Sequence, residues 1–330
     1  LTPAKILNKT SFINAIHAAM AMGCSTNAII HLIAISRRAG KECTVTLEDF
    51  DLASRKVPVI ANIRPSGDQY LMEDFYYAGG MPALLKQMGD HLNPSALTIT
   101  GKTIGENIQD AEVNNEDVIR PLNNPIYKEG ALAVLKGNIA PGGAVIKPSA
   151  CAEKFLKHTG SALVFDSYPE MKKAVEDENL DVTENHILVL RNAGPKGGPG
   201  MPEWGMLPIP VKLVKQGVRD MLRLSDARMS GTSYGACILH VSPESYIGGP
   251  LALVKTGDLI TVDVPNRTIH LEISDEELYQ RKAEWTTPEP KYERGYGWMF
   301  SKHILQAEDG CDFDFLETSF GKPVPEPDIF

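Results

Sequence analysis

The sequence is poor in cysteine, and the few cysteines that it has lie far apart. None of the five belongs to a C-x-x-C pair: Cys24, Cys43, Cys151, Cys237 and Cys311. An odd number without paired spacing argues against a disulfide framework. Because free thiols persist in a reducing compartment, we expect a cytoplasmic protein whose cysteines are mostly small buried side chains.

Positive charge is also scarce, and long apolar runs are missing. Lysine and arginine number 33 against 42 aspartates and glutamates, so the net charge is −9. Proteins that bind nucleic acid need basic surface to contact the phosphates. No apolar run reaches the roughly 18 residues of a membrane helix, and the start of the chain lacks the charged-then-apolar order of a signal peptide. We therefore expect neither a nucleic-acid partner nor a membrane partner.

An initiator methionine is missing as well. The chain opens with LTPAKILNKT, directly before an apolar pattern of helical spacing. On this ground we expect a shortened or processed chain whose own N-terminal half lies elsewhere.

The residues that are present have the composition of an ordinary globular protein. Hydrophobic residues make up 43% and charged residues 23% of a chain of 330 residues, which is long enough for about two domains. Residues 109–130 are rich in Asn, Asp, Glu and Pro without an apolar period, which is typical of a connection. We therefore predict one domain over residues 1–115 and another over residues 116–330.

The two predicted domains differ in their apolar periodicity. Helical spacing dominates the first, with one short strand expected at residues 96–100. In the C-terminal domain, helices are expected at residues 151–158, 169–178, 210–217 and 274–285. Short β-type runs occupy residues 131–137, 143–148, 161–167, 186–192, 221–226, 236–242, 258–264 and 268–274. Eight strands with few helices predict an α/β (α+β) protein whose C-terminal domain is β-barrel-like.

Glycine and proline gather in one stretch, NAGPKGGPGMPEWGMLPIP at residues 192–210. Such a run cannot be the interior of a helix or strand, because glycine costs entropy there and proline lacks the amide hydrogen. It predicts a shaped loop around a single carboxylate, Glu203, with exposed amides that suit an anionic ligand or a metal-bound substrate. The stretch RLSDARMSGTSYG at residues 223–235 predicts a strand that ends in hydroxyl groups, with Asp226 and Arg228 as an internal ion pair. The two stretches predict two walls of one site.

GPKGGPGMPE and SDARMSGTSYG resemble the two C-terminal signatures of the dihydroxy-acid and sugar-acid dehydratase family. In its form, SDARMSGTSYG resembles the pentonate (arabinonate-type) branch more than the branched-chain amino-acid enzyme. GCSTNAIIHLIAI, at the start of a predicted helix, is similar to the family's GGSTN helix, with Cys24 in place of the second glycine. The resemblance covers nearly the whole chain, but only the C-terminal portion of a family enzyme.

The resemblance implies a site and a reaction. The glutamate of the first signature, here Glu203, is a Mg²⁺ ligand in the family. The serine of the other signature, here Ser230, is in its deprotonated form the base that removes the C2 proton. Thr232 is a candidate contact for the substrate carboxylate. Ser25 and Thr26 are further candidate substrate contacts, since a hydroxyl-rich helix start suits an anion. The implied reaction converts a 2,3-dihydroxy sugar acid into a 2-keto-3-deoxy acid.

The resemblance also implies cofactors and assembly. Family enzymes carry Mg²⁺ and a [2Fe-2S] cluster, and the three cluster cysteines belong to motifs of the N-terminal half. None of the five cysteines here matches those motifs. We therefore expect this chain by itself to bind no cluster and to have no dehydratase activity. Family enzymes look like dimers or tetramers, so we expect a homo-oligomer.

Other interpretations stay open. By residue type alone, Glu203 reads as a solvated loop acid and Ser230 as a turn hydroxyl. The segment GTSYG also satisfies the G-x-S-x-G pattern of serine hydrolases, with Ser233 as nucleophile and Asp258 and His270 downstream. That pattern needs a following helix, whereas ACILHV predicts a strand. A third possibility is a β domain that binds a small anion without chemistry.

Overall fold

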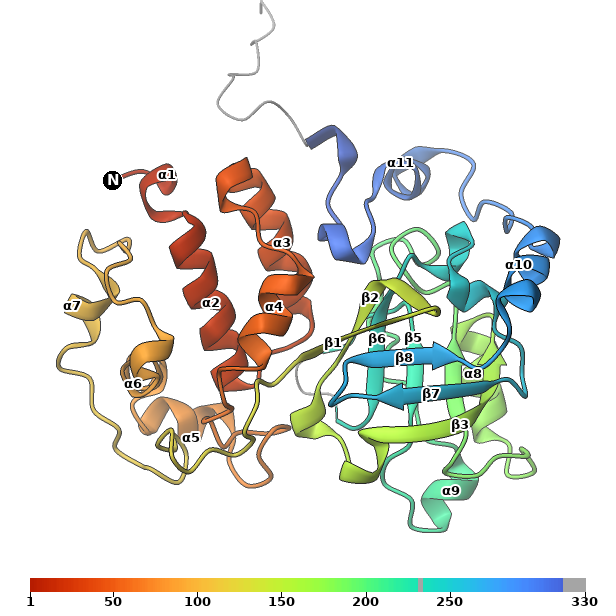
Figure 1. Ribbon diagram of the computed structural model, residues 1–330, viewed down its shortest axis with the longest axis horizontal. Helices are drawn as coiled ribbons and strands as arrows, with labels where there is room; N and C mark the ends of the chain where they lie inside the picture. The colour runs from red at the N-terminus through yellow and green to blue at the C-terminus, as the bar shows by residue number, and fades with distance from the viewer. Residues whose placement is uncertain (231–233, 317–330) are drawn as a thin grey trace, which may run out of the picture.

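The computed structural model describes residues 1–230 and 234–316, which form two parts that lie side by side (Figure 1). Residues 1–132 form the helical part, and residues 133–271 form a closed barrel that is followed by further helices. The predicted fold class is confirmed: the protein combines helices with an eight-stranded mixed sheet that closes on itself.

The helical part buries its apolar faces against the barrel. Its helices are α1 (Pro3–Ile6), α2 (Lys9–Met22), α3 (Asn27–Ala39), α4 (Leu47–Ser54), α5 (Met72–Tyr77), α6 (Gly80–Gln87) and α7 (Ile104–Ile108). Residues such as Ile16 and Ile33 recur at helical spacing on the buried faces of α2 and α3. The core that they form includes side chains from the outer face of the barrel, among them Val145 and Leu239.

All eight predicted β-type runs form strands. They are β1 (Ala133–Gly137), β2 (Ala140–Ile146), β3 (Lys157–Phe165), β4 (Ile187–Leu190), β5 (Arg223–Ser225), β6 (Cys237–Ser242), β7 (Leu259–Asp263) and β8 (Thr268–Leu271). Their order around the barrel is β1-β2-β6-β5-β4-β3-β7-β8. Strands β3 to β6 are parallel neighbours, and the bridge between Lys136 and Thr268 closes the barrel. Closure leaves no sheet edge unpaired.

The outer helices of the C-terminal part agree in large part with the prediction. They are α8 (Tyr168–Glu176), α9 (Val211–Lys215), α10 (Asp275–Glu284) and α11 (Gly295–His303). Helix α10 begins at Ser274, whose hydroxyl accepts the amide of Glu277 at 3.1 Å. Helices α10 and α11 lie along the upper side of the barrel in Figure 1.

Two predicted elements are wrong. The expected strand at residues 96–100 is a local turn with one isolated bridge between Leu97 and Thr103, because no neighbouring strand pairs with it. The expected helix at residues 151–158 is a short 3-10 turn at Glu153–Phe155. Strand β3 already begins at Lys157, because that residue and the next pair with β7. Tertiary pairing here overrides local helical preference.

The expectations about thiols and membrane spans can also be compared with the structure. The five cysteines are free thiols in the structure. Within residues 1–230 and 234–316, no helix combines the length and the apolar character needed to cross a bilayer.

Candidate active site

Three segments that are distant in sequence meet where the helical part contacts the barrel. The side chain of Asn27, at the first turn of α3, donates from Nδ2 to Glu203 Oε1 at 2.8 Å. The hydroxyls of Ser25 and Thr26 lie 3.4 Å from the carbonyl oxygen of Met229. The start of α3 therefore contacts the loop that carries Glu203 and also the residue directly before Ser230.

The turn between α2 and α3 directs these side chains. Gly23 ends α2 with φ +83°, and a Cβ at this position would lie 2.5 Å from the Ser66 hydroxyl. Only glycine meets both demands at low cost. Cys24, which differs from the resembling family motif, is not among the residues with positive φ. The substitution therefore leaves the turn intact.

A buried cation holds this turn from behind. Lys147 in the segment after β2 is 1% exposed, and its Nζ donates to the carbonyl oxygen of Gly23 at 2.6 Å. Burial lowers the pKa of Lys147 to about 8, and the neighbouring thiols of Cys24 and Cys151 oppose that shift. Within the described residues no carboxylate pairs with this ammonium group. The positive charge of Lys147 thus contacts the turn that leads into α3.

The glycine- and proline-rich loop is closed differently from the prediction, which expected exposed amides for an anionic ligand. The amides of Lys196 and Gly197 instead donate to the carboxylate of Glu244, each at 2.9 Å to its nearest oxygen. The amide of Gly205 donates to the carbonyl of Arg228 at 2.8 Å. The amides of Lys196 and Gly197 are thus already bonded to a carboxylate of the protein itself, and these bonds hold the loop that carries Glu203.

Glu244 lies in an acidic and largely buried environment. Its Oε1 also accepts Gln306 Nε2 at 2.8 Å, and its own amide donates to Gln306 Oε1 at 2.8 Å. Burial, together with the nearby Asp226 carboxylate, raises the pKa of Glu244 to about 7. The protonation of this one side chain is therefore coupled to the loop that presents Glu203.

The predicted ion pair between Asp226 and Arg228 is wrong. Asp226 is fully buried and accepts the amides of Ala193 and Ser245 and the Ser245 hydroxyl, at 2.5 to 3.0 Å. Arg228 turns the other way and donates from Nε to the carbonyl of Met201 at 2.5 Å. Both residues thus hold the loop at 192–210, but from two directions.

The segment after α11 covers the same region. Arg37 and Arg38 at the end of α3 form ion pairs with Asp309 and Asp312, at 2.8 and 2.5 Å. A small apolar cluster joins α3, the loop and this segment: Ile30, Met201, Ala307 and Cys311. Ion pairs join α3 to the segment after α11, and the apolar cluster joins both of them to the loop at residues 192–210.

The structure places some of the predicted site residues and not others. Glu203 is exposed, Ser230 is half-buried, and Thr26 is buried. Thr232 and Ser233 lie outside the described residues. The roles given to Glu203, Ser230, Ser25 and Thr26 stay predictions, although their segments converge.

The oxygen atoms near Glu203 fit a hard divalent cation. Asn27 Oδ1 is a buried acceptor with no hydrogen-bond partner among the residues that the structure describes, and it belongs to the side chain that contacts the Glu203 carboxylate. Mg²⁺ prefers carboxylate and carbonyl oxygens and keeps several waters. No group of three His, Cys, Asp or Glu side chains suited to a metal occurs in residues 1–230 and 234–316. These residues thus fit one or two Mg²⁺ ligands, and they do not fit a [2Fe-2S] cluster.

Three contributing residues could not be recognised as site residues from the sequence: Asn27, Lys147 and Glu244. Asn27 is part of the GCSTN segment, so that segment was the available signal, although a capping role was the simpler interpretation. Lys147 and Glu244 carry no local pattern that marks them. Lys147 contacts a residue that lies 124 positions away in the sequence. Glu244 contacts residues that lie 47 and 48 positions away.

The hydrolase interpretation meets a structural obstacle. After Tyr234 and Gly235 the chain enters β6, a fully buried strand, where the nucleophile motif needs a helix. Asp258 forms an ion pair with Arg281. Among the described residues, Asp258 makes no hydrogen bond to a histidine. The geometry around this motif therefore does not favour a serine hydrolase.

Comparison with known proteins identifies relatives over nearly the full chain. L-arabinonate dehydratase of Rhizobium leguminosarum bv. trifolii is 48% identical over 98% of this chain and 56% of the relative. The 6-deoxy-6-sulfo-D-gluconate dehydratase of Pseudomonas putida is 47% identical over 99% of this chain and 56% of the relative. A dihydroxy-acid dehydratase of Caldanaerobacter subterraneus subsp. tengcongensis is 42% identical over 95% of this chain and 56% of the relative. The chain thus spans just over half the length of these relatives.

Two family models match as well. The model described as dihydroxy-acid/6-phosphogluconate dehydratase C-terminal matches residues 117–311, and the N-terminal model of the same family matches residues 1–107. Together they cover both parts of the fold. The chain therefore belongs to the dihydroxy-acid/6-phosphogluconate dehydratase family.

Proposed function

We propose that this chain provides the base and a metal ligand of a hydro-lyase that dehydrates a 2,3-dihydroxy sugar acid. The observation that carries the proposal is the hydrogen bond between Asn27 and Glu203, together with the contacts of Ser25 and Thr26 to the Met229 carbonyl. These contacts bring the two family signatures and the GCSTN helix start to one place. Family membership supplies the reaction class.

Dehydration of such an acid has two difficult steps, because the C2 proton is weakly acidic and hydroxide is a poor leaving group. In the proposed reaction the deprotonated Ser230 takes the C2 proton, the C3 hydroxyl leaves, and it receives that proton from Ser230, so that water forms and the base is restored. The resulting enol rearranges to the 2-keto-3-deoxy acid. A divalent cation, when bound, supplies Lewis-acid stabilisation of the negative charge on the substrate carboxylate and the enolate.

The residues of this chain have separate duties in that scheme. Glu203 and the Asn27 oxygen would hold the cation, and Glu244 keeps the Glu203 loop in place. Ser25 and Thr26 fix the backbone before Ser230 through the Met229 carbonyl. A serine is a weak base in water, so a fixed position beside positive charge is what makes it usable.

For the substrate we propose a sugar acid of the pentonate type. Two of the relatives are named for sugar acids, L-arabinonate and 6-deoxy-6-sulfo-D-gluconate. Their identities of 48% and 47% exceed the 42% to a dihydroxy-acid dehydratase. The form of the SDARMSGTSYG segment supports the same choice.

The test joins the chain to the part of the Rhizobium leguminosarum enzyme that it does not match, and measures formation of the 2-keto-3-deoxy acid from L-arabinonate. The joined protein should turn over, and its Ser230→Ala variant should lose about 10²- to 10⁴-fold in kcat. Glu203→Gln should raise the Mg²⁺ concentration needed for half-maximal turnover. Ser95→Ala, an exposed serine outside the site, is the matched control. Unchanged turnover of the Ser230→Ala variant would refute the assignment of the base.

Three companion proposals go with this function. The 330-residue chain alone should show no iron, no sulfide and no turnover, which an iron and sulfide assay and the same product assay examine. A homo-oligomer, dimer or tetramer, should appear in light scattering. A cytoplasmic location remains a prediction from cysteine usage.

A β domain that binds an anion without chemistry is the remaining alternative. Ligand binding by Ser230→Ala without activity in any joined protein would favour it.

A further inference from the structure

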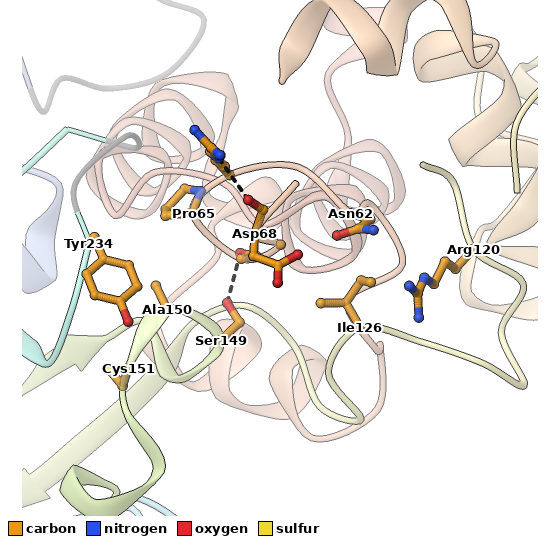
Figure 2. Close-up of a pocket in the computed structure, with 12 residues that line it drawn as sticks. Asn62, Pro65, Asp68, Arg120, Ile126, Ser149, Ala150, Cys151 and Tyr234 are labelled. Carbon is orange, nitrogen blue, oxygen red and sulfur yellow. Dashed lines mark hydrogen bonds between the residues drawn. The ribbon is translucent and has the colours of Figure 1, made fainter. Parts of the chain in front are cut away.

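A separate cavity lies beside the turn at Gly23. Its volume is about 610 Å³, and Figure 2 shows its walls, which come from Asn62, residues 64–68, Arg120, Ile126, residues 149–151 and Tyr234. Ser66 connects it to the candidate active site, because Ser66 packs directly against Gly23 at the end of α2. We call it the Arg120 cavity.

Arg120 carries an unbalanced positive charge into this cavity. Its backbone is fixed, since its amide donates to the Ile60 carbonyl at 2.8 Å and the neighbouring Asn62 amide donates to the Val118 carbonyl at 2.8 Å. The side chain is half-buried and lies beside Ile126 in Figure 2. Among the described residues its guanidinium has neither an ion pair nor a hydrogen bond. Partly buried charges are usually paired in proteins, so this one suits an anion from outside.

The other walls present groups that suit hydroxyls. The Ser66 and Ser149 hydroxyls lie 2.9 Å apart and join the helical part to the segment after β2. Asn62 is 5% exposed and held by a donor bond to the Asp117 carbonyl at 2.9 Å. The carboxylate of Asp68 points into the space in Figure 2 and can only accept hydrogen bonds when ionised. The hydroxyls of a polyhydroxylated molecule can donate to Asp68 and can exchange hydrogen bonds with the two serines.

The cavity is also close to the proposed base along the chain. Tyr234 lines it and follows Ser230 by four positions. Four residues span at most about 14 Å even when fully extended. A ligand that starts near Ser230 therefore has the Arg120 cavity within the reach of a small molecule.

We propose that the Arg120 cavity binds the far end of a sugar acid, a polyhydroxylated chain, and that a terminal acidic group on that chain contacts Arg120. Guanidinium groups bind phosphate, sulfonate and carboxylate through paired N–H donors, so the chemistry covers any of these terminal groups. The hydroxyls of the chain face Asp68 and the serine pair. This inference rests on the proposed function and deepens it: Arg120 favours sugar acids with a charged far end, and a pentonate, whose far end is a neutral hydroxyl, should bind more weakly.

Isothermal titration of the 330-residue chain tests the proposal with three probes: 6-phospho-D-gluconate, D-gluconate and inorganic phosphate. The phosphorylated sugar acid should bind at least about tenfold more tightly than either of the others. Arg120→Gln should reduce its affinity to the level of D-gluconate, and Arg120→Lys should retain part of it. Arg294→Gln, an exposed arginine outside the cavity, should bind like the unchanged chain. Thermal unfolding checks that each variant is folded.

Three outcomes would overturn the proposal: equal binding by Arg120→Gln, equal affinity for inorganic phosphate and the sugar acid, or no binding of any probe. The result is separable from the test of the proposed function, because it measures no turnover. Arg120-dependent binding beside an inactive joined protein would count against the reaction and not against the cavity. An active joined protein without Arg120-dependent binding would count against the cavity alone.

Discussion

The barrel and the helical part differ in how far each depends on the other. The buried residues of the barrel core all come from residues 133–271, and closed strand pairing satisfies their backbone groups. The core of the helical part is completed by barrel residues, including Val134, Met229 and Leu239. The barrel therefore carries its own core, whereas the helices need the outer face of the barrel as one of their walls.

This difference explains where the candidate site lies. Glu203 and Ser230 belong to barrel connections, which rest on a self-sufficient scaffold. Ser25, Thr26 and Asn27 come from the dependent part, and they reach the site only when the helices are docked. Functional residues commonly lie on loops that a rigid scaffold positions. Three variants test the comparison, and they are taken in order of expected effect.

The largest effect is expected from Arg223→Ala in β5. Arg223 is 1% exposed and pairs with Asp220 at 3.0 Å, and the Asp220 side chain is buried as well. Removing one partner leaves a buried charge uncompensated, so the free energy of unfolding should fall by about 3–5 kcal/mol. Urea unfolding followed by circular dichroism measures it. Lys154→Ala is the control, because its pair with Glu184 is exposed and should cost less than about 1 kcal/mol. Equal losses in the two variants would contradict the account.

A smaller and more local effect is expected from Leu239→Ala. Leu239 is fully buried on the outer face of β6, within the core of the helical part. The substitution should cost about 2–4 kcal/mol and loosen α2 and α3 before the barrel strands. Amide hydrogen exchange read by mass spectrometry should show faster exchange in α2 and α3 alone. Leu224→Ala, in the barrel core, should speed exchange in both parts. Identical exchange patterns would show that the helices and the barrel open together.

The smallest effect is expected from Glu244→Gln, and it depends on pH. The pKa of Glu244 is raised to about 7 from an ordinary 4.5, because the side chain is buried beside Asp226. The folded state thus binds the proton of Glu244 more tightly than the unfolded state does. This preference adds to the free energy of unfolding, in full below pH 4.5, and the contribution is lost as the pH rises through 7. Relative to Glu244→Gln, the unchanged chain should lose about 1–3 kcal/mol between pH 4.5 and pH 8. Urea unfolding at several pH values measures the difference, and parallel curves for the two proteins would contradict it.

Local patterns in the sequence predicted much of the fold. The eight β-type runs became the eight strands, because alternating and β-branched residues favour extended chain wherever a partner strand is found. The helix expected at residues 274–285 became α10, and the Ser274 side chain caps its first turn. The strand expected at residues 96–100 failed for the opposite reason, since no partner strand lies beside it.

The site divides in the same way. The sequence alone pointed to Glu203 and Ser230 through two compact signatures, and it marked the loop at residues 192–210 by its glycines and prolines. It did not reveal that Asn27 contacts Glu203 across 176 positions, or that Glu244 accepts hydrogen bonds from amides of the loop. It also paired Asp226 with its neighbour Arg228, whereas the folded chain gives Asp226 to Ser245.

What the sequence by itself determined are the features that depend on near neighbours: strand and helix periodicity, caps, turns and family signatures. What only the tertiary structure decided is which buried polar groups satisfy one another. A carboxylate or amide inside a protein must find a partner wherever the fold brings one within reach, and that distance is set by the packing of the helical part on the barrel and not by position along the chain.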